Sequence, residues 1–102
     1  MMITGSQCRA ARALIEISRE MLASFSGVDE ETILKFEHKL ETPGDEIILS
    51  LRNALENAGA VFLPEGERGI GVRLKFTRSE ARRLSILESE GGVVGDDEVP
   101  GA

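Results

Sequence analysis

The sequence has few of the residues that carry enzyme and metal-site chemistry. It contains one cysteine, one histidine, no tyrosine and no tryptophan. A single cysteine, Cys8, excludes an internal disulfide, fits the reducing cytoplasm, and is expected to be a small buried residue rather than a reactive thiol. The lone histidine, His38, has no carboxylate pair beside it at metal-ligand spacing, and no serine forms a catalytic triad with it. We therefore expect no enzyme activity, no cofactor and no bound metal.

Long apolar segments are also missing. No run is long enough to span a bilayer, and the first ten residues lack the basic stretch and apolar core of a signal peptide. The only aromatic residues are four phenylalanines, so a stacking platform for single-stranded nucleic acid is not expected. The glycine-rich stretch GERGIG (66–71) lacks the Gly-Lys-Ser/Thr end of a phosphate loop and is interpreted as a hairpin turn. These absences predict a cytoplasmic protein with no membrane partner.

Basic charge is scarce. The net charge of -6 argues against nucleic-acid binding, because DNA-binding domains normally carry a basic face. The acidic excess is unevenly spread, however: residues 1–76 carry nine Lys and Arg against twelve Asp and Glu, and residues 77–102 carry three against six. Half of the excess therefore lies in the last quarter of the chain, away from the segment that resembles a DNA-binding motif.

That segment is Ser18 to Glu37, which reads as two short helices joined by a tight turn. Ser18 and Asp29 are good N-caps for the two helices, and Gly27 has the backbone freedom to end the first one sharply. A small apolar patch is expected to hold the helices at a fixed angle; it consists of Leu22, Val28, Ile33 and Phe36. This pattern predicts a helix-turn-helix, in which the second helix can enter a DNA major groove.

Helices are also predicted on both sides of this motif. Thr4 and Gln7 form a capping box that opens a helix to Ile17. Asp45 is expected to cap a helix that runs to about Ala58 and ends at Gly59. The residues expected on the inner face of this last helix are Ile47 or Ile48, Leu51, Leu55 and Ala58.

The pattern changes after residue 59. Residues 60–63 (AVFL) and 72–76 (VRLKF) predict a β-hairpin, which must pack on the helices or pair with the hairpin of a second subunit, since an isolated hairpin is marginal in water. A second capping box, Thr77 and Glu80, opens a further short helix. We thus expect four parts: a helix-turn-helix domain (1–59), the hairpin (60–76), a C-terminal helix (77–90) and a disordered acidic tail (91–102).

Four stretches of the chain, TGSQCRAARALIEIS, SGVDEETILKFE, LRNALENAGAVFL and GVRLKF, resemble the Cro/lambda-repressor-type (Xre) helix-turn-helix regulators. The resemblance covers roughly residues 3–76. It implies a mainly α fold, a four- to five-helix lambda-repressor-like bundle with a C-terminal β-hairpin, that binds double-stranded DNA as a homodimer on a two-fold operator. It also implies a buried ion pair between Arg12 and Glu37.

The resemblance further implies a set of DNA contacts. Arg19 matches a position that touches phosphate or a base near the edge of the half-site, and Thr32 matches a phosphate contact. Glu30, Glu31 and Lys35 match base-facing positions of the recognition helix. Further positive charge at the rim would come from Arg9, His38 and Lys39.

The recognition helix departs from the family pattern, because it opens with Asp29, Glu30 and Glu31. These acids complement the helix dipole but oppose the phosphate backbone, although a glutamate can read cytosine. Two functions therefore remain open. One is a sequence-specific repressor that binds DNA as a homodimer. The other is a protein-binding antiactivator or antitoxin-like module whose acidic surface meets a second, basic protein.

Overall fold

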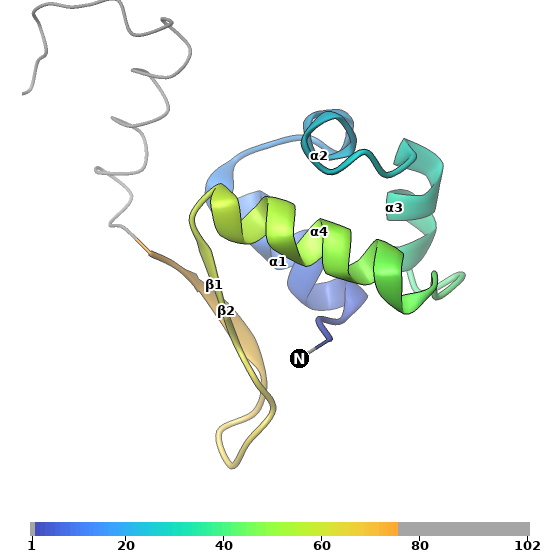
Figure 1. The fold of residues 1–102 in the computed structure, drawn as a ribbon. Helices are drawn as coiled ribbons and strands as arrows, with labels where there is room; N and C mark the ends of the chain where they lie inside the picture. The colour runs from blue at the N-terminus through green and yellow to red at the C-terminus, as the bar shows by residue number, and fades with distance from the viewer. Residues whose placement is uncertain (1, 76–102) are drawn as a thin grey trace, which may run out of the picture.

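The structure is a computed structural model that describes residues 2–75. In this range the chain forms four helices and then an antiparallel β-hairpin (Figure 1), which confirms the mainly α prediction. The elements are α1 (Gly5–Ile15), α2 (Arg19–Ser26), α3 (Glu30–Glu37), α4 (Asp45–Asn57), β1 (Ala60–Leu63) and β2 (Gly71–Leu74). The predicted helix 77–90 and tail 91–102 lie outside the described residues.

The first helix begins as predicted. The Thr4 hydroxyl accepts a hydrogen bond from the Gln7 N–H at 3.1 Å, and the Gln7 side chain accepts one from the Thr4 N–H at 3.0 Å. The helix ends at Ile15, two residues earlier than predicted, because Glu16 adopts a left-handed conformation with φ 68°. Its first turn meets α3 closely: a Cβ on Gly5 would collide with the carbonyl oxygen of Phe36. Glycine therefore lets the two backbones touch.

One hydrophobic core joins all the described elements. α2 and α3 lie on one side of α1 and α4, and the hairpin lies on the other (Figure 1). The four residues predicted to fix the helix-turn-helix angle are all buried, which confirms that prediction. The complete buried apolar set is Ile3, Cys8, Ala11, Leu22, Val28, Ile33, Phe36, Ile48, Leu51, Ala54, Leu55, Ala60 and Phe62.

Two details of the fourth helix were predicted wrongly. Gly44, not Asp45, occupies the N-cap position, and no side chain caps this helix. Asp45 is instead the first helical residue, where its charge still complements the helix dipole. At the other end Ala58 is the exposed C-cap rather than an inner residue. Of Ile47 and Ile48, the two candidates for the start of the inner face, Ile48 is the buried residue. It is 4% exposed, whereas Ile47 is 38% exposed.

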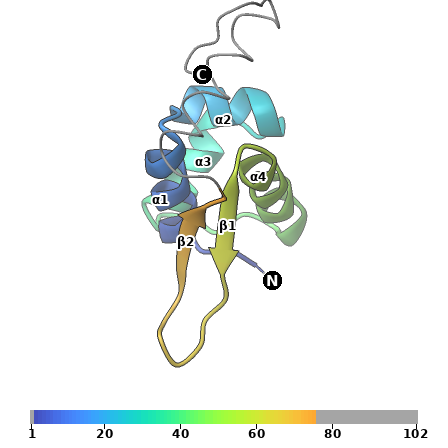
Figure 2. The same ribbon diagram turned by 90° about the vertical axis from the view of Figure 1, so that its left-hand side faces the viewer.

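The hairpin pairs Ala60 with Leu74 and Leu63 with Gly71. β2 therefore begins one residue before the predicted strand and ends at Leu74, while Phe76 lies outside the described residues. Phe62 points into the core, and β2 packs on α1 while β1 lies toward α4 (Figure 2). This confirms that the hairpin packs on the helices. A side chain on α1 strengthens the contact: the Gln7 amide donates to the Leu63 and Gly71 carbonyls at 3.2 and 2.9 Å.

Candidate nucleic-acid interface

The turn between α2 and α3 has the geometry that the sequence predicted. The Ser18 hydroxyl caps α2 by accepting from the Met21 N–H at 3.0 Å. Gly27 then ends α2 in a left-handed conformation with φ 76°, and its N–H donates to the Ala23 carbonyl at 2.8 Å. Since side chains disfavour this φ, glycine suits the position.

The third helix has one buried face and one exposed face. The Asp29 carboxylate caps it by accepting from the N–H groups of Glu31 and Thr32 at 3.1 and 3.3 Å, so one of the three leading acids is engaged with the backbone. The buried face consists of Ile33, Phe36 and Glu37. The other face carries exposed Glu30, Glu31 and His38, with half-buried Leu34 and Lys35. The side of α3 that would meet a DNA duplex is therefore not packed into the protein.

A buried carboxylate at the end of α3 binds the side chains of two arginines. Glu37 is fully buried and accepts from the Nε and Nη2 of Arg12, each at 2.7 Å. This is the ion pair that the family resemblance implied. Arg19 joins it, with its Nη1 at 3.4 Å from the same carboxylate, and the Cys8 thiol donates at 3.4 Å. Because Arg12 and Cys8 stand on α1 and Arg19 on α2, the cluster ties three helices together.

The environment decides the charge of each group in this cluster. Burial alone would raise the pKa of Glu37, but the hydrogen bonds and positive charge of Arg12 outweigh burial and lower it, so Glu37 is ionised. The hydrogen bond to Glu37 raises the pKa of Arg12. Burial, followed by the charge of Glu37, raises the pKa of the Cys8 thiol. Cys8 is thus a buried hydrogen-bond donor and not a reactive thiolate, in line with the expectation from its sequence.

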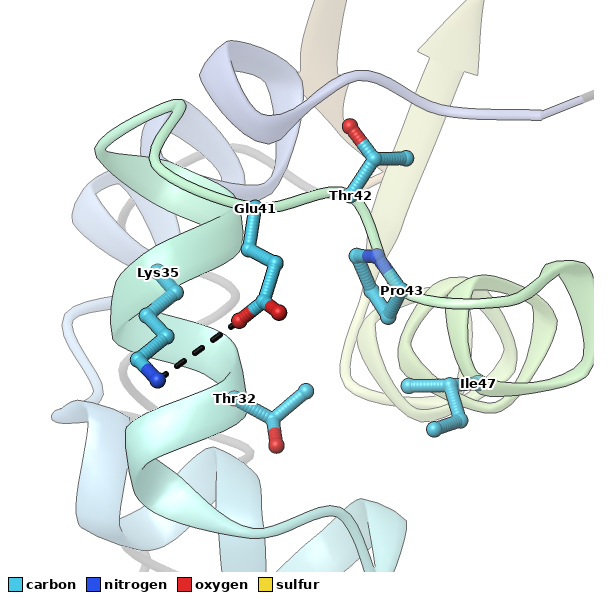
Figure 3. Close-up of a pocket in the computed structure, with 6 residues that line it drawn as sticks. All are labelled: Thr32, Lys35, Glu41, Thr42, Pro43 and Ile47. Carbon is cyan, nitrogen blue, oxygen red and sulfur yellow. Dashed lines mark ion pairs between the residues drawn. The ribbon is translucent and has the colours of Figure 1, made fainter.

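The cation in the middle of the α3 surface is paired with the protein's own acids. Lys35 Nζ lies 3.4 Å from Glu31 Oε2 and 3.5 Å from Glu41 Oε1, and its side chain remains 40% exposed. The hydrogen bond and charge of Glu31 raise the pKa of Lys35. Figure 3 shows Lys35 and Glu41 beside a shallow pocket of about 220 Å³. The pocket lies between α3 and the start of α4 and is lined by Thr32, Lys35, Glu41, Thr42, Pro43 and Ile47.

The predicted DNA contacts fall into three places. Glu30 and Glu31 are exposed at the start of α3, and Thr32 and Lys35 line the pocket next to them. His38 and Lys39 are exposed just past its C-terminal end, where Lys39 adopts φ 61°. Arg19 stands apart from both groups: its side chain is 31% exposed and its guanidinium points to Glu37.

Several contacts were not predicted from the sequence. They include the Arg19–Glu37 bond, the Lys35–Glu41 pair and the link from Gln7 to the hairpin. Only the spacing of Glu31 and Lys35, four residues apart on a helix, is a local signal for an ion pair. The Arg19–Glu37 bond and the link from Gln7 join residues that only the tertiary fold brings together. Lys35 and Glu41 meet because the chain turns back after α3, where the Glu41 N–H donates to the Lys35 carbonyl at 3.3 Å.

Among residues 2–75, no group of three or more histidine, cysteine or acidic side chains is arranged to hold a metal ion. None of the helices in that range is both long and apolar enough to cross a bilayer. A scan of protein-family models found no match to this chain. A search of curated proteins found no match either.

Proposed function

We propose that this chain is a sequence-specific DNA-binding regulator, a repressor that binds a palindromic operator as a homodimer. The observation that supports the proposal most is the exposed outer face of α3, held at a fixed angle by the turn at Gly27. The four described helices and the hairpin are the elements that a lambda-repressor-like bundle would contain. In such a dimer two α3 helices would enter the major groove about 34 Å apart, one turn of DNA.

The charged side chains around α3 would determine how this protein binds DNA. His38 and Lys39 supply exposed donors past the end of the helix. Lys35 would reach a phosphate or base by leaving Glu31 and Glu41, whose side chains are 70% and 69% exposed. Ion pairs between exposed side chains are weak, so this exchange requires little free energy. Glu30 and Glu31 would oppose phosphates but can accept a hydrogen bond from cytosine N4.

The test is a fluorescence-anisotropy titration of the full chain with its own upstream DNA at low and moderate salt. We expect Lys35→Ala and Arg19→Ala each to weaken operator binding by about 1–3 kcal/mol. Arg68→Ala is the matched control, because it removes one positive charge from the hairpin loop, away from α3 (Figure 1). Thermal melts of each variant separate loss of binding from loss of folding.

No specific binding at low salt by the folded wild-type chain would overturn the proposal. Unchanged affinity in both the Lys35 and Arg19 variants would place the DNA surface elsewhere on the protein. A loss of affinity in the Arg68 variant equal to that in the Lys35 variant would show that only overall charge matters, and would argue against sequence-specific contact through α3.

A second candidate function is a protein-binding module that meets a basic partner, in the manner of an antiactivator or antitoxin. The specific observation in its favour is that the central cation of α3 is already paired with two carboxylates. Converting both acids to amides, Glu31→Gln with Glu41→Gln, distinguishes the two functions. A DNA-binding surface should gain non-specific DNA affinity because Lys35 is released, whereas a surface for a basic protein should lose affinity for that protein.

A further inference from the structure

The exposed face of α3 presents an ion pair whose two members belong to the same helix. Lys35 Nζ lies 3.4 Å from Glu31 Oε2, and the two residues are four positions apart, so they are neighbours on the helix surface. The Glu31 side chain is 70% exposed and the Lys35 side chain 40% exposed, so solvent reaches both. The pair therefore offers a hydrogen-bond acceptor and a donor side by side, in a fixed order along α3.

A second carboxylate contacts Lys35 from outside the helix. After α3 the chain turns back at Lys39, whose φ is 61°, and the N–H groups of Leu40 and Glu41 donate to the Lys35 carbonyl at 2.8 and 3.3 Å. This turn places Glu41 Oε1 3.5 Å from Lys35 Nζ, beside the pocket (Figure 3). Lys35 thus has one acidic partner on α3 and another in the loop that follows α3.

The edge of a guanine–cytosine base pair matches the ion pair on α3. In the major groove this base pair presents guanine O6, an acceptor, beside the cytosine N4 amino group, a donor. The two atoms are hydrogen-bonded to each other about 2.9 Å apart, close to the 3.4 Å between Lys35 Nζ and Glu31 Oε2. Lys35 can donate to guanine O6 while Glu31 accepts from cytosine N4, and their own bond stays in place. A phosphate offers no donor to Glu31, so it cannot be bound in the same way.

The order of donor and acceptor on α3 selects among the four base pairs. Read across the groove from the Lys35 side to the Glu31 side, cytosine–guanine and adenine–thymine pairs offer a donor first and an acceptor second, which is the wrong order. A thymine–adenine pair has the right order, thymine O4 and then adenine N6. Its outer groups do not fit, however, because the thymine methyl replaces guanine N7 beside Lys35, and adenine N7, an acceptor, lies beside Glu31. The guanine–cytosine pair alone suits both side chains.

We propose that Glu31 and Lys35 read one guanine–cytosine pair in each half-site as a unit, with Lys35 on guanine and Glu31 on cytosine. Glu41 has the opposite role: it reads no base and competes with guanine for Lys35, which must leave it when DNA binds. The inference rests on the proposed function, since it concerns what α3 recognises once it lies in the groove. It assigns different roles to two carboxylates that contact the same ammonium group.

The first test compares Glu31→Gln with Glu41→Gln, a matched pair because the two carboxylates lie 3.4 and 3.5 Å from Lys35 Nζ and are 70% and 69% exposed. The full chain selects its site from random duplex DNA, and each base pair of that site is then replaced by the other three. We expect wild type to prefer guanine–cytosine at one position per half-site by about 5- to 150-fold. Glu31→Gln should lose this preference, because an amide donates as well as accepts. Glu41→Gln should keep it and bind every sequence more tightly.

The second test reverses the ion pair. Glu31→Lys with Lys35→Glu exchanges donor and acceptor, so the preference at the same position should change from guanine–cytosine to cytosine–guanine while the rest of the selected site stays the same. Glu41→Gln is included both in this protein and in its reference, because Glu41 would otherwise face the carboxylate introduced at position 35. Thermal melts establish that the exchanged protein is folded. If it is not, the comparison of the two glutamine variants still decides the proposal.

Equal base preferences of the two glutamine variants at every position, or an unchanged guanine–cytosine preference in the folded exchanged protein, would overturn the reading of a base pair by Glu31 and Lys35. These outcomes differ from failure of the proposed function. A folded chain that selects no DNA sequence contradicts both proposals. A chain that selects a site, but whose base preferences do not respond to Glu31, remains a DNA-binding regulator and contradicts only this inference.

Discussion

The buried Glu37 carboxylate binds side chains from both α1 and α2, and its removal should destabilise the whole domain. Glu37→Gln keeps the shape but leaves Arg12, whose side chain is 13% exposed, without its counter-charge. Breaking a buried ion pair in this way costs about 3–5 kcal/mol. Urea denaturation measures the loss. Glu56→Gln is the control, since it removes the carboxylate that faces Arg52 on the surface of α4, and should change stability by roughly 0.5 kcal/mol or less.

Glu37 should also make stability depend on pH. Its pKa in the folded protein lies below the ordinary value of 4.5. As pH falls through 4.5 the unfolded chain takes up a proton on Glu37 while the folded chain does not, so the contribution of Glu37 is complete above this pH and is lost progressively below it. Urea midpoints between pH 3 and 7 should show the stability difference between wild type and Glu37→Gln shrinking as the solution becomes acidic. A difference that stays constant with pH would contradict the ionised Glu37–Arg12 pair.

At the scale of the elements, the backbones of α1 and α3 lie close together at Gly5. We expect Gly5→Ala to push the two backbones apart at the Phe36 carbonyl and to destabilise the fold by at least about 1–3 kcal/mol, as overpacking does. Gly66→Ala is the control, because a Cβ there meets nothing within 4 Å. Chemical denaturation of both variants checks this, and a Gly5 variant as stable as the control would mean that the helices can separate freely.

One amide on α1 adds hydrogen bonds to the packing between α1 and the hairpin. Gln7 is 3% exposed, and its replacement by alanine leaves the Leu63 and Gly71 carbonyls without their side-chain donor. We expect Gln7→Ala to destabilise the protein by about 1–3 kcal/mol, because it removes two side-chain hydrogen bonds that each contribute about 0.5–1.5 kcal/mol. Hydrogen exchange should increase at β1 and β2 amides more than in α4. Equal increases in all elements would show that Gln7 acts only as the cap of α1.

At the scale of the whole molecule, the sequence predicted the helices and the turn because their signals are local. Thr4, Ser18, Asp29 and Gly27 each act on backbone groups within a few residues. The start of α4 was misplaced because Gly44 and Asp45 both suit the beginning of a helix, Gly44 as a cap and Asp45 as a charge in the first turn.

The links between elements could not be predicted in the same way. Gln7 and Gly71 are 64 positions apart, and Arg19 and Glu37 are 18 apart. No spacing rule joins residues so distant, because their contact depends on how the helices pack. The resemblance supplied the Arg12–Glu37 pair, but not the involvement of Arg19 or the pairing of Lys35 with Glu41. These two ion pairs of the candidate site are therefore seen only in the three-dimensional structure.

The first turn of α1 contacts both α3 and the hairpin. Its backbone lies against α3 at Gly5, and the Gln7 side chain donates a hydrogen bond to the hairpin. In the homodimer of the proposed function, no loose linker would therefore separate α3 from the rest of its own subunit. Each added base pair of spacer moves the half-sites apart by about 3.4 Å and rotates one against the other. A rigid subunit cannot adjust to such a change. We therefore expect the protein to bind operators of one spacer length and to bind operators longer or shorter by a single base pair more weakly.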